Sequence, residues 1–207
     1  NETMTLNTSS TAPSSALRRE DLWSLEEYSE ERAEFREMVL THKKNRQISL
    51  GDHILLIFED RLTLKYQIQE MLRIEKVFET QGIQDELDAY NPLLPDGNNW
   101  KCTMLIQFPD VDERKAELKR LIGVEEKVWI RIGDSEKVFP IADEDMEREN
   151  GEKTSAVHFL RYQLNEQQIL LAKTGAELTA GVQHFAYVTP DIVFTEAERQ
   201  ALYDDLT

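Results

Sequence analysis

The spacing of hydrophobic residues along the chain predicts amphipathic helices and short strands. From Ser24 to Arg46 these residues recur about every 3.6 positions, which is the period of a helix with one buried side. Ser24 and Glu27 have the spacing of a capping box, in which two side chains satisfy free backbone N–H groups at the start of a helix. The run Ile54–Phe58 is hydrophobic without alternation, as is typical of a strand covered on both faces.

The rest of the chain divides into further elements in an irregular order. Gln81–Gly82 separates two helices, and Gly133–Ser135 joins two strands as a β-hairpin. Further helices are predicted at 62–79, 83–90, 112–122, 166–172 and 196–206, and further strands at 47–50, 102–108, 128–132, 138–141, 155–164 and 178–188. Because strands and helices do not alternate regularly, we predict an α+β fold. In it, a mixed, largely antiparallel sheet packs with an N-terminal helix, a helical hairpin and a C-terminal helix.

The composition is that of a folded protein with one main domain. The chain has 207 residues, of which 40% are hydrophobic. Residues 1–16, rich in Ser, Thr, Asn and Pro, are predicted to form a flexible tail, and residues 17–207 a single α+β domain. The one cysteine, Cys102, cannot form an internal disulfide, and no hydrophobic run approaches the roughly 20 residues that span a bilayer. We therefore expect a cytoplasmic protein.

The charge of the chain narrows the classes of partner. There are 40 acidic residues against 24 Lys and Arg, which gives a net charge of −16. Binding to nucleic acid needs clustered cations for the phosphates, and anionic membranes repel a protein of this charge. We therefore expect neither nucleic acid nor membrane as a partner.

The common catalytic and ligand-binding motifs are absent from the sequence. There is no glycine-rich phosphate loop, no G-x-S-x-G, no C-x-x-C and no H-E-x-x-H. The segment Asp143–Glu147 begins like a calcium-binding loop, but Arg148 stands where the sharp turn of such a loop needs glycine. We therefore interpret this acidic connection as a solvated loop.

One carboxylate in the predicted helix 62–79 is unusual. At 100° per residue, Glu75 falls within the hydrophobic stripe of the helix, which consists of Leu64, Ile68, Met71, Leu72 and Phe78. Glu is rarely buried without a partner, and burial raises its pKa unless a cation or a hydrogen-bond donor compensates. A carboxylate that points into a core is therefore a candidate for a functional site.

Three further residues complete a candidate metal site. Glu70 lies beside the same stripe, and Glu86 lies in the next helix, so that a helical hairpin would bring both close to Glu75. His158, in the middle of a predicted strand, is either a hydrogen-bonded core histidine or a fourth ligand. Carboxylates with an imidazole suit iron, manganese or another divalent metal. Two alternatives remain open: a structural salt bridge to Arg61, Arg73 or Arg161, and a pocket in which Glu75 receives a cationic group of a small ligand.

Five separated segments of the chain resemble an uncharacterised bacterial family of unknown function. They are Leu22–Tyr28, Ile57–Glu59, Gln67–Arg73 with Glu75, Glu86–Asn91 and Ser155–Arg161. The resemblance extends from about Leu17 to Leu206. It implies genes near those of rubrerythrin-like and iron–sulfur proteins, and therefore a role beside iron-containing redox proteins. It supplies no catalytic residues.

Two hypotheses for the function follow from the sequence. The first is an accessory or interaction protein that acts with an iron-containing redox partner of the iron–sulfur type, because catalytic motifs are absent and the resemblance implies such a partner. The second is a metal-binding protein or metal-dependent enzyme that uses Glu70, Glu75, Glu86 and His158 to hold iron or manganese.

Overall fold

The computed structural model describes residues 15–207, so that most of the predicted tail, 1–16, lies outside the described residues. The helices are α1 (Leu25–Lys43), α2 (Arg61–Glu75), α3 (Thr80–Tyr90), α4 (Val111–Arg120), α5 (Glu166–Lys173) and α6 (Glu196–Tyr203). The strands are β1 (Gln47–Leu50), β2 (Ile54–Phe58), β3 (Asn99–Ile106), β4 (Val128–Ile132), β5 (Ile141–Ala142), β6 (Val157–Gln163), β7 (Leu178–Val182) and β8 (Ile192–Val193). Three short 3₁₀ helices are η1 (Arg19–Asp21), η2 (Asn91–Leu93) and η3 (Val124–Glu126). No helix in residues 15–207 is long and apolar enough to cross a membrane.

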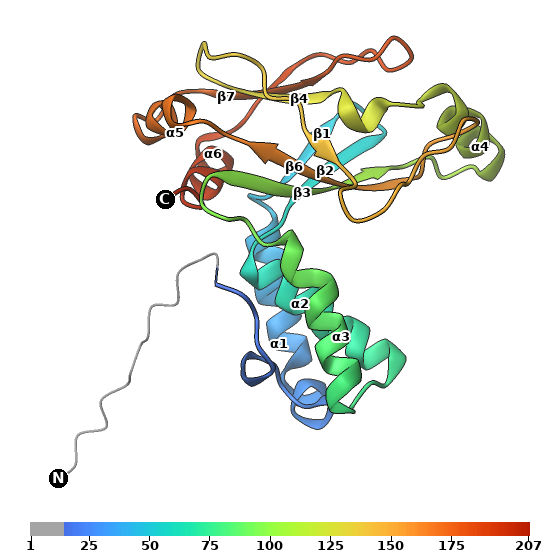
Figure 1. Cartoon of the computed structure of the whole chain (residues 1–207), viewed down its shortest axis with the longest axis vertical. Coiled ribbons are helices and arrows are strands. Elements are labelled where there is room, and N and C mark those ends of the chain that lie inside the picture. The colour runs from blue at the N-terminus through green and yellow to red at the C-terminus, as the bar shows by residue number, and fades with distance from the viewer. Residues whose placement is uncertain (1–14) are drawn as a thin grey trace.

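Two antiparallel sheets form the upper part of the molecule in Figure 1. One has the order β1-β2-β3-β6-β5 and the other has the order β4-β7-β8. The longest pairing joins β3 to β6, where Met104 lies opposite His158. The prediction of an α+β fold with a largely antiparallel sheet is confirmed, with two sheets in place of one.

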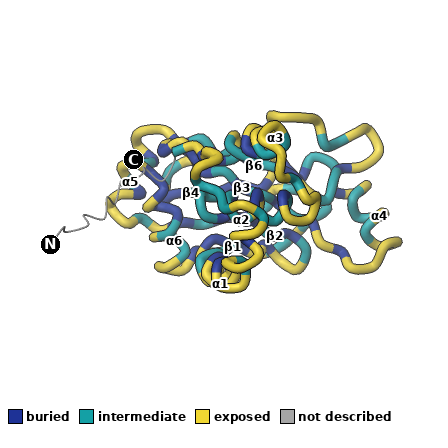
Figure 2. Tube along the Cα trace, turned by 90° about the horizontal axis from the view of Figure 1, so that it is seen from below, coloured by how far each residue is buried: buried dark blue, intermediate teal, exposed yellow. Residues whose placement is uncertain are grey.

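The main hydrophobic core lies between the two sheets. Alternate residues of β3 and β6 are buried, and the buried strands run through the centre of the molecule in Figure 2. Trp100, on β3, is 1% exposed, and its indole N–H donates to the carbonyl oxygen of Leu202 at 2.8 Å. This hydrogen bond fixes the C-terminal helix α6 against the larger sheet.

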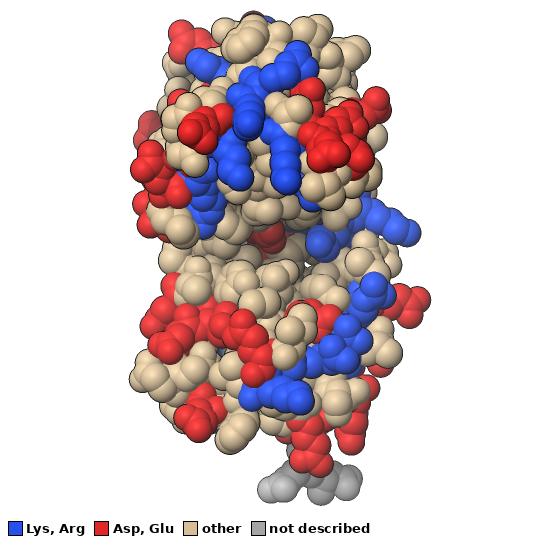
Figure 3. Space-filling model, turned by 90° about the vertical axis from the view of Figure 1, so that its right-hand side faces the viewer, with Lys and Arg blue, Asp and Glu red and all other residues tan. Residues whose placement is uncertain are grey.

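Helices α1, α2 and α3 form a helical arm that projects from the sheets (Figure 1). The arm has two hydrophobic clusters of its own, one centred on Ile68 and Leu87 and one on Tyr28 and Phe35. Figure 3 shows the narrow waist between the sheets above and the arm below, with acidic and basic side chains interspersed on both parts of this face. A cleft of about 470 Å³ lies between α3 and β6 at this junction.

A buried arginine joins the arm to the sheets. Arg46 follows α1, is 2% exposed, and pairs with Asp60 at the start of α2 and with Asp205 after α6. Its Nε also donates to the carbonyl oxygen of Phe58, the last residue of β2, at 2.8 Å. The guanidinium group therefore holds together the ends of three helices and one strand.

The helical hairpin differs from the predicted one in where its first helix ends. α2 ends at Glu75, because Lys76 adopts a left-handed conformation with φ 54° and the N–H of Val77 bonds back to Leu72. The predictions of a helix to residue 79 and of a break at Gln81–Gly82 are therefore wrong. Because the chain turns at Lys76, the side chain of Phe78 leaves the α2 stripe and is 72% exposed.

The predicted hairpin after β4 is reduced to one bridge, between Ile130 and Val138. Residues 141–142 instead form β5, which pairs with β6 in the other sheet. The chain therefore crosses between the sheets at this point and carries Asp143 to the N-terminal half of β6.

Candidate functional site

The structure does not bring the four predicted ligands together. Glu75 is exposed at the end of α2, so the prediction that its side chain points into the core is wrong, because the helix ends there. Glu86, on α3, is half-buried, and burial together with the nearby Glu75 carboxylate raises its pKa. These two residues are neighbours, as predicted, but Glu70 contacts α1 instead, and His158 lies in the sheet.

Glu70 is the acceptor of a structural hydrogen-bond network. Arg32 donates to both of its oxygens through Nε and Nη2, at 2.8–3.2 Å, and the hydroxyls of Tyr28 and Tyr66 donate at 3.1 and 3.0 Å. The hydrogen bonds from Arg32 hold the pKa of Glu70 below its usual value. Glu70 therefore forms a structural salt bridge, but its partner is Arg32 and not Arg61, Arg73 or Arg161 as the alternative predicted.

We expect Glu70→Gln to destabilise the protein by about 1–2 kcal/mol near pH 7, because four donors lose a charged acceptor. The pKa of Glu70 is lowered in the folded protein, so its contribution is complete above the unfolded value near 4.5 and is lost as the pH falls through the folded value. Urea unfolding at pH 7 and at pH 3 measures this difference, which should shrink at the lower pH. A difference that does not depend on pH would contradict the assignment.

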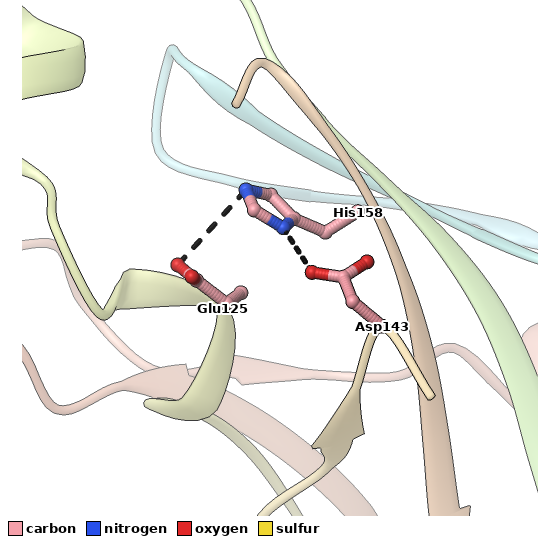
Figure 4. Close-up of side chains that lie close together, drawn as sticks. All are labelled: Glu125, Asp143 and His158. Carbon is pink, nitrogen blue, oxygen red and sulfur yellow. Dashed lines mark hydrogen bonds and ion pairs between the residues drawn. The ribbon is translucent and has the colours of Figure 1, made fainter. Parts of the chain in front are cut away.

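His158 lies in a different cluster, with Glu125 and Asp143 (Figure 4). Its Nδ1 is 2.6 Å from Oδ2 of Asp143, and its Nε2 is 3.9 Å from Oε2 of Glu125. One ligand atom from each of the three residues lies within 4.8 Å of the others. The imidazole is fully buried, and the side chains of the two carboxylates are only 5% and 8% exposed.

Three separate elements position these side chains. Glu125 lies in η3, which follows Gly123, a glycine with φ 82° that turns the chain after α4. Asp143 comes directly after β5, and its own positive φ of 54° directs the chain away from the sheet. His158 is the second residue of β6 and points inward with Leu160.

Hydrogen bonds from the surrounding chain orient the cluster. The backbone N–H of Phe159 donates to Oδ1 of Asp143 at 2.9 Å, and Arg148 donates to the same oxygen at 3.2 Å. The hydroxyl of Thr154 donates to Oε2 of Glu125 at 3.0 Å. Both carboxylates are therefore fixed in orientation, as is common around metal ligands.

The environment of Glu125 perturbs its ionisation. Burial is the main cause that raises its pKa, to about 8, and a hydrogen bond with the neighbouring carboxyl group of Glu149 raises it further. Glu149 also accepts from the backbone N–H of Gly123 at 3.1 Å. Near neutral pH, Glu125 therefore holds a proton in a place where a cation can replace it.

The cluster does not have the arrangement of a nucleophilic triad. Thr154 Oγ1 lies 2.9 Å from Nε2 of His158, but Nε2 is also 2.8 Å from the carbonyl oxygen of Ser155, which can only accept. Nε2 therefore carries a hydrogen, and the hydroxyl of Thr154, 1% exposed, donates to Glu125 instead. Two carboxylates and an imidazole are better suited to bind a metal ion than to activate Thr154 as a nucleophile.

Sequence reasoning missed Glu125 and Asp143. Asp143 belongs to the connection interpreted as solvated, yet its side chain is 8% exposed, which corrects that interpretation at this residue. The signal available in the sequence is His158 itself, a polar residue on the buried side of a strand. Such a residue needs hydrogen-bond partners, and the acidic connection before the strand is the nearest source of them.

The comparisons with known proteins agree with the fold. Residues 16–206 match the family model described as a protein of unknown function, DUF3501. The chain belongs to the DUF3501 family. This confirms the family resemblance found in the sequence.

A solved structure and the curated proteins complete the comparison. The chain is similar to the crystal structure, at 1.90 Å resolution, of a novel protein of unknown function from Burkholderia pseudomallei K96243. The two are 44% identical over 93% of this chain and 100% of that chain, with a TM-score of 0.89. No curated protein matches the sequence. The DUF3501 fold is thus shared with a solved structure.

Proposed function

We propose that this DUF3501 protein binds one divalent transition-metal ion, iron or manganese, through Glu125, Asp143 and His158. The observation that carries the proposal is that three side chains from three elements, almost fully buried, each bring one ligand atom within 4.8 Å of the others. This is the second hypothesis from the sequence, with His158 kept as a ligand and the three glutamates of the helical arm replaced as its partners.

The spacing of the donors supports the proposal. Ligand atoms bind transition metals at roughly 2.0–2.2 Å, so that two ligands of one ion lie up to about 4.2 Å apart. The 3.9 Å between Nε2 of His158 and Oε2 of Glu125 falls within this range, and an ion bound between them would replace the hydrogen that Nε2 donates to Ser155 in the metal-free protein. Carboxylates are ligands that suit manganese, and imidazole is a ligand that suits iron.

The first hypothesis, an accessory role beside an iron-containing redox protein, remains a proposal. A metal site would give the protein an ion to exchange with such a partner. Three protein ligands leave coordination positions free, so that such an ion can react or be passed on. What supports the association is the family resemblance together with this site.

Metal binding is tested by titrating the metal-free protein with Mn²⁺ at pH 8 and counting bound ions by electron paramagnetic resonance and elemental analysis. We expect one ion per wild-type chain and none in His158→Gln. The matched control is Glu75→Gln/Glu86→Gln, which removes the neighbouring carboxylates of the helical arm and should leave one ion bound. An ion that is lost from this control and kept by His158→Gln would overturn the assignment of the site.

A further inference from the structure

We infer that the acidic cavity beside Glu125 is an entry vestibule for hydrated divalent cations, and that the bound metal is therefore exchangeable cargo. The inference rests on the proposed function and adds the class of species that uses the site. It follows from three features of the cavity: its lining, its continuity with the buried ligands, and its charge.

The cavity has a volume of about 590 Å³ and lies between η3 and the connection that follows β5. Seven carboxylates line it, and the one cation among its lining residues is Arg148. The guanidinium group of Arg148 is already neutralised, because it donates to both oxygens of Asp145 at 2.6 and 2.8 Å and to Asp143. Glu144 is also paired, with Arg161, so the negative charge of the cavity comes mainly from the remaining carboxylates.

The carboxylates lead from solvent to the proposed ligands. Glu126 and Glu147 are exposed, Glu149 is half-buried, and Glu125 and Asp143 form the inner wall. Glu149 shares a hydrogen bond with Glu125 and is held by the N–H of Gly123, so that it stands between the entrance and the buried cluster. A cation entering the cavity thus finds oxygen ligands at each depth.

The same charge excludes one large class of substrate. Phosphate esters, carboxylic acids and other anions are repelled by a negatively charged cavity, whereas divalent cations are concentrated in it. The volume is ample for a hydrated ion. The species best matched to the cavity is therefore the metal ion itself, which fits a protein that acquires and releases metal for a partner.

Stopped-flow competition against a fluorescent Mn²⁺ chelator tests the vestibule. We expect Glu126→Gln/Glu147→Gln to slow Mn²⁺ association about fivefold, since steering by charged clefts raises association rates tenfold or more. The spectrum of the bound ion should not change, because neither residue belongs to the proposed ligand set. The slowing should shrink as salt is raised, because salt screens exposed charges.

The matched control is Glu166→Gln/Glu177→Gln, which changes the net charge equally on exposed residues that do not line the cavity. It should associate at nearly the wild-type rate. If both double variants slow association equally, or neither does, the wild-type protein still binds metal and only the vestibule is overturned. If the wild-type protein binds no Mn²⁺, the proposed function itself fails.

Discussion

Glu125→Gln should weaken Mn²⁺ binding by about 100-fold or more and, at the same time, stabilise the metal-free protein above pH 5. Loss of an outer partner of a metal ligand already costs 10–100-fold in affinity, so loss of a ligand oxygen charge costs at least as much. The stabilisation has a separate origin, in the environment of Glu125. Its carboxyl group is buried and lies beside Glu149, and burial first and Glu149 second raise its pKa to about 8.

The direction of the pH effect follows from this raised pKa. The unfolded chain ionises Glu125 near 4.5, whereas the folded protein keeps it protonated to about pH 8. The folded state therefore binds more protons between these values, and stability falls as the pH rises from about 4.5 through 8. Glutamine has no proton to lose and accepts the hydroxyl hydrogen of Thr154 equally well, so the variant lacks this part of the pH dependence.

Urea unfolding of the metal-free wild type and of Glu125→Gln at pH 5, 7 and 9 measures the effect. We expect the two curves to coincide near pH 4.5 and the variant to be more stable at pH 9. Added Mn²⁺ should stabilise the wild type by mass action and leave the variant unchanged. A variant that is less stable at pH 9 and still responds to Mn²⁺ would show that Glu125 is a structural acceptor and not a metal ligand.

The local elements could be predicted because local signals determine them. The capping box of Ser24 and Glu27 begins α1 as expected, and the hydrophobic run Ile54–Phe58 forms β2. The end of α2 could not be predicted, because it depends on Lys76, a non-glycine residue in a left-handed conformation. Tertiary contacts stabilise such a conformation, and sequence periodicity does not report them.

The candidate site was harder to predict than the fold, for the same physical reason. The residue of the candidate site that the sequence prediction also named, His158, stands out because it is a polar residue at a buried position of a strand. Its partner Glu125 comes from a 3₁₀ helix 33 positions earlier, and its partner Asp143 from a polar connection. In such segments the sequence does not distinguish a buried carboxylate from a solvated one. At Glu75 the sequence predicted a buried side chain that is in fact exposed. A helical wheel assumes that the helix continues beyond the residue, whereas α2 ends at Glu75.

The second large effect is expected at Arg46, where Arg46→Met should destabilise the protein by about 3–5 kcal/mol. The substitution leaves Asp60 and Asp205 without a buried cation and removes the donors to Phe58 and Ala201. Methionine fills much of the volume, so the loss comes from the uncompensated charges and carbonyl groups. The cost is large because the side chains of Asp60 and Asp205 are only 14% and 9% exposed.

Arg46→Met/Asp205→Asn tests this cause directly, because it removes one of the two stranded charges. Burial already raises the pKa of Asp205 against the attraction of Arg46, so an amide at this position avoids a charge that the site disfavours without its partner. The double variant should therefore recover part of the stability lost in the single variant, as measured by urea unfolding at pH 7. A single variant that loses less than about 1 kcal/mol would show that the network behaves like an exposed salt bridge. The helical arm would then be held to the sheets by hydrophobic contacts, and not by the guanidinium group at which α1, α2 and α6 meet.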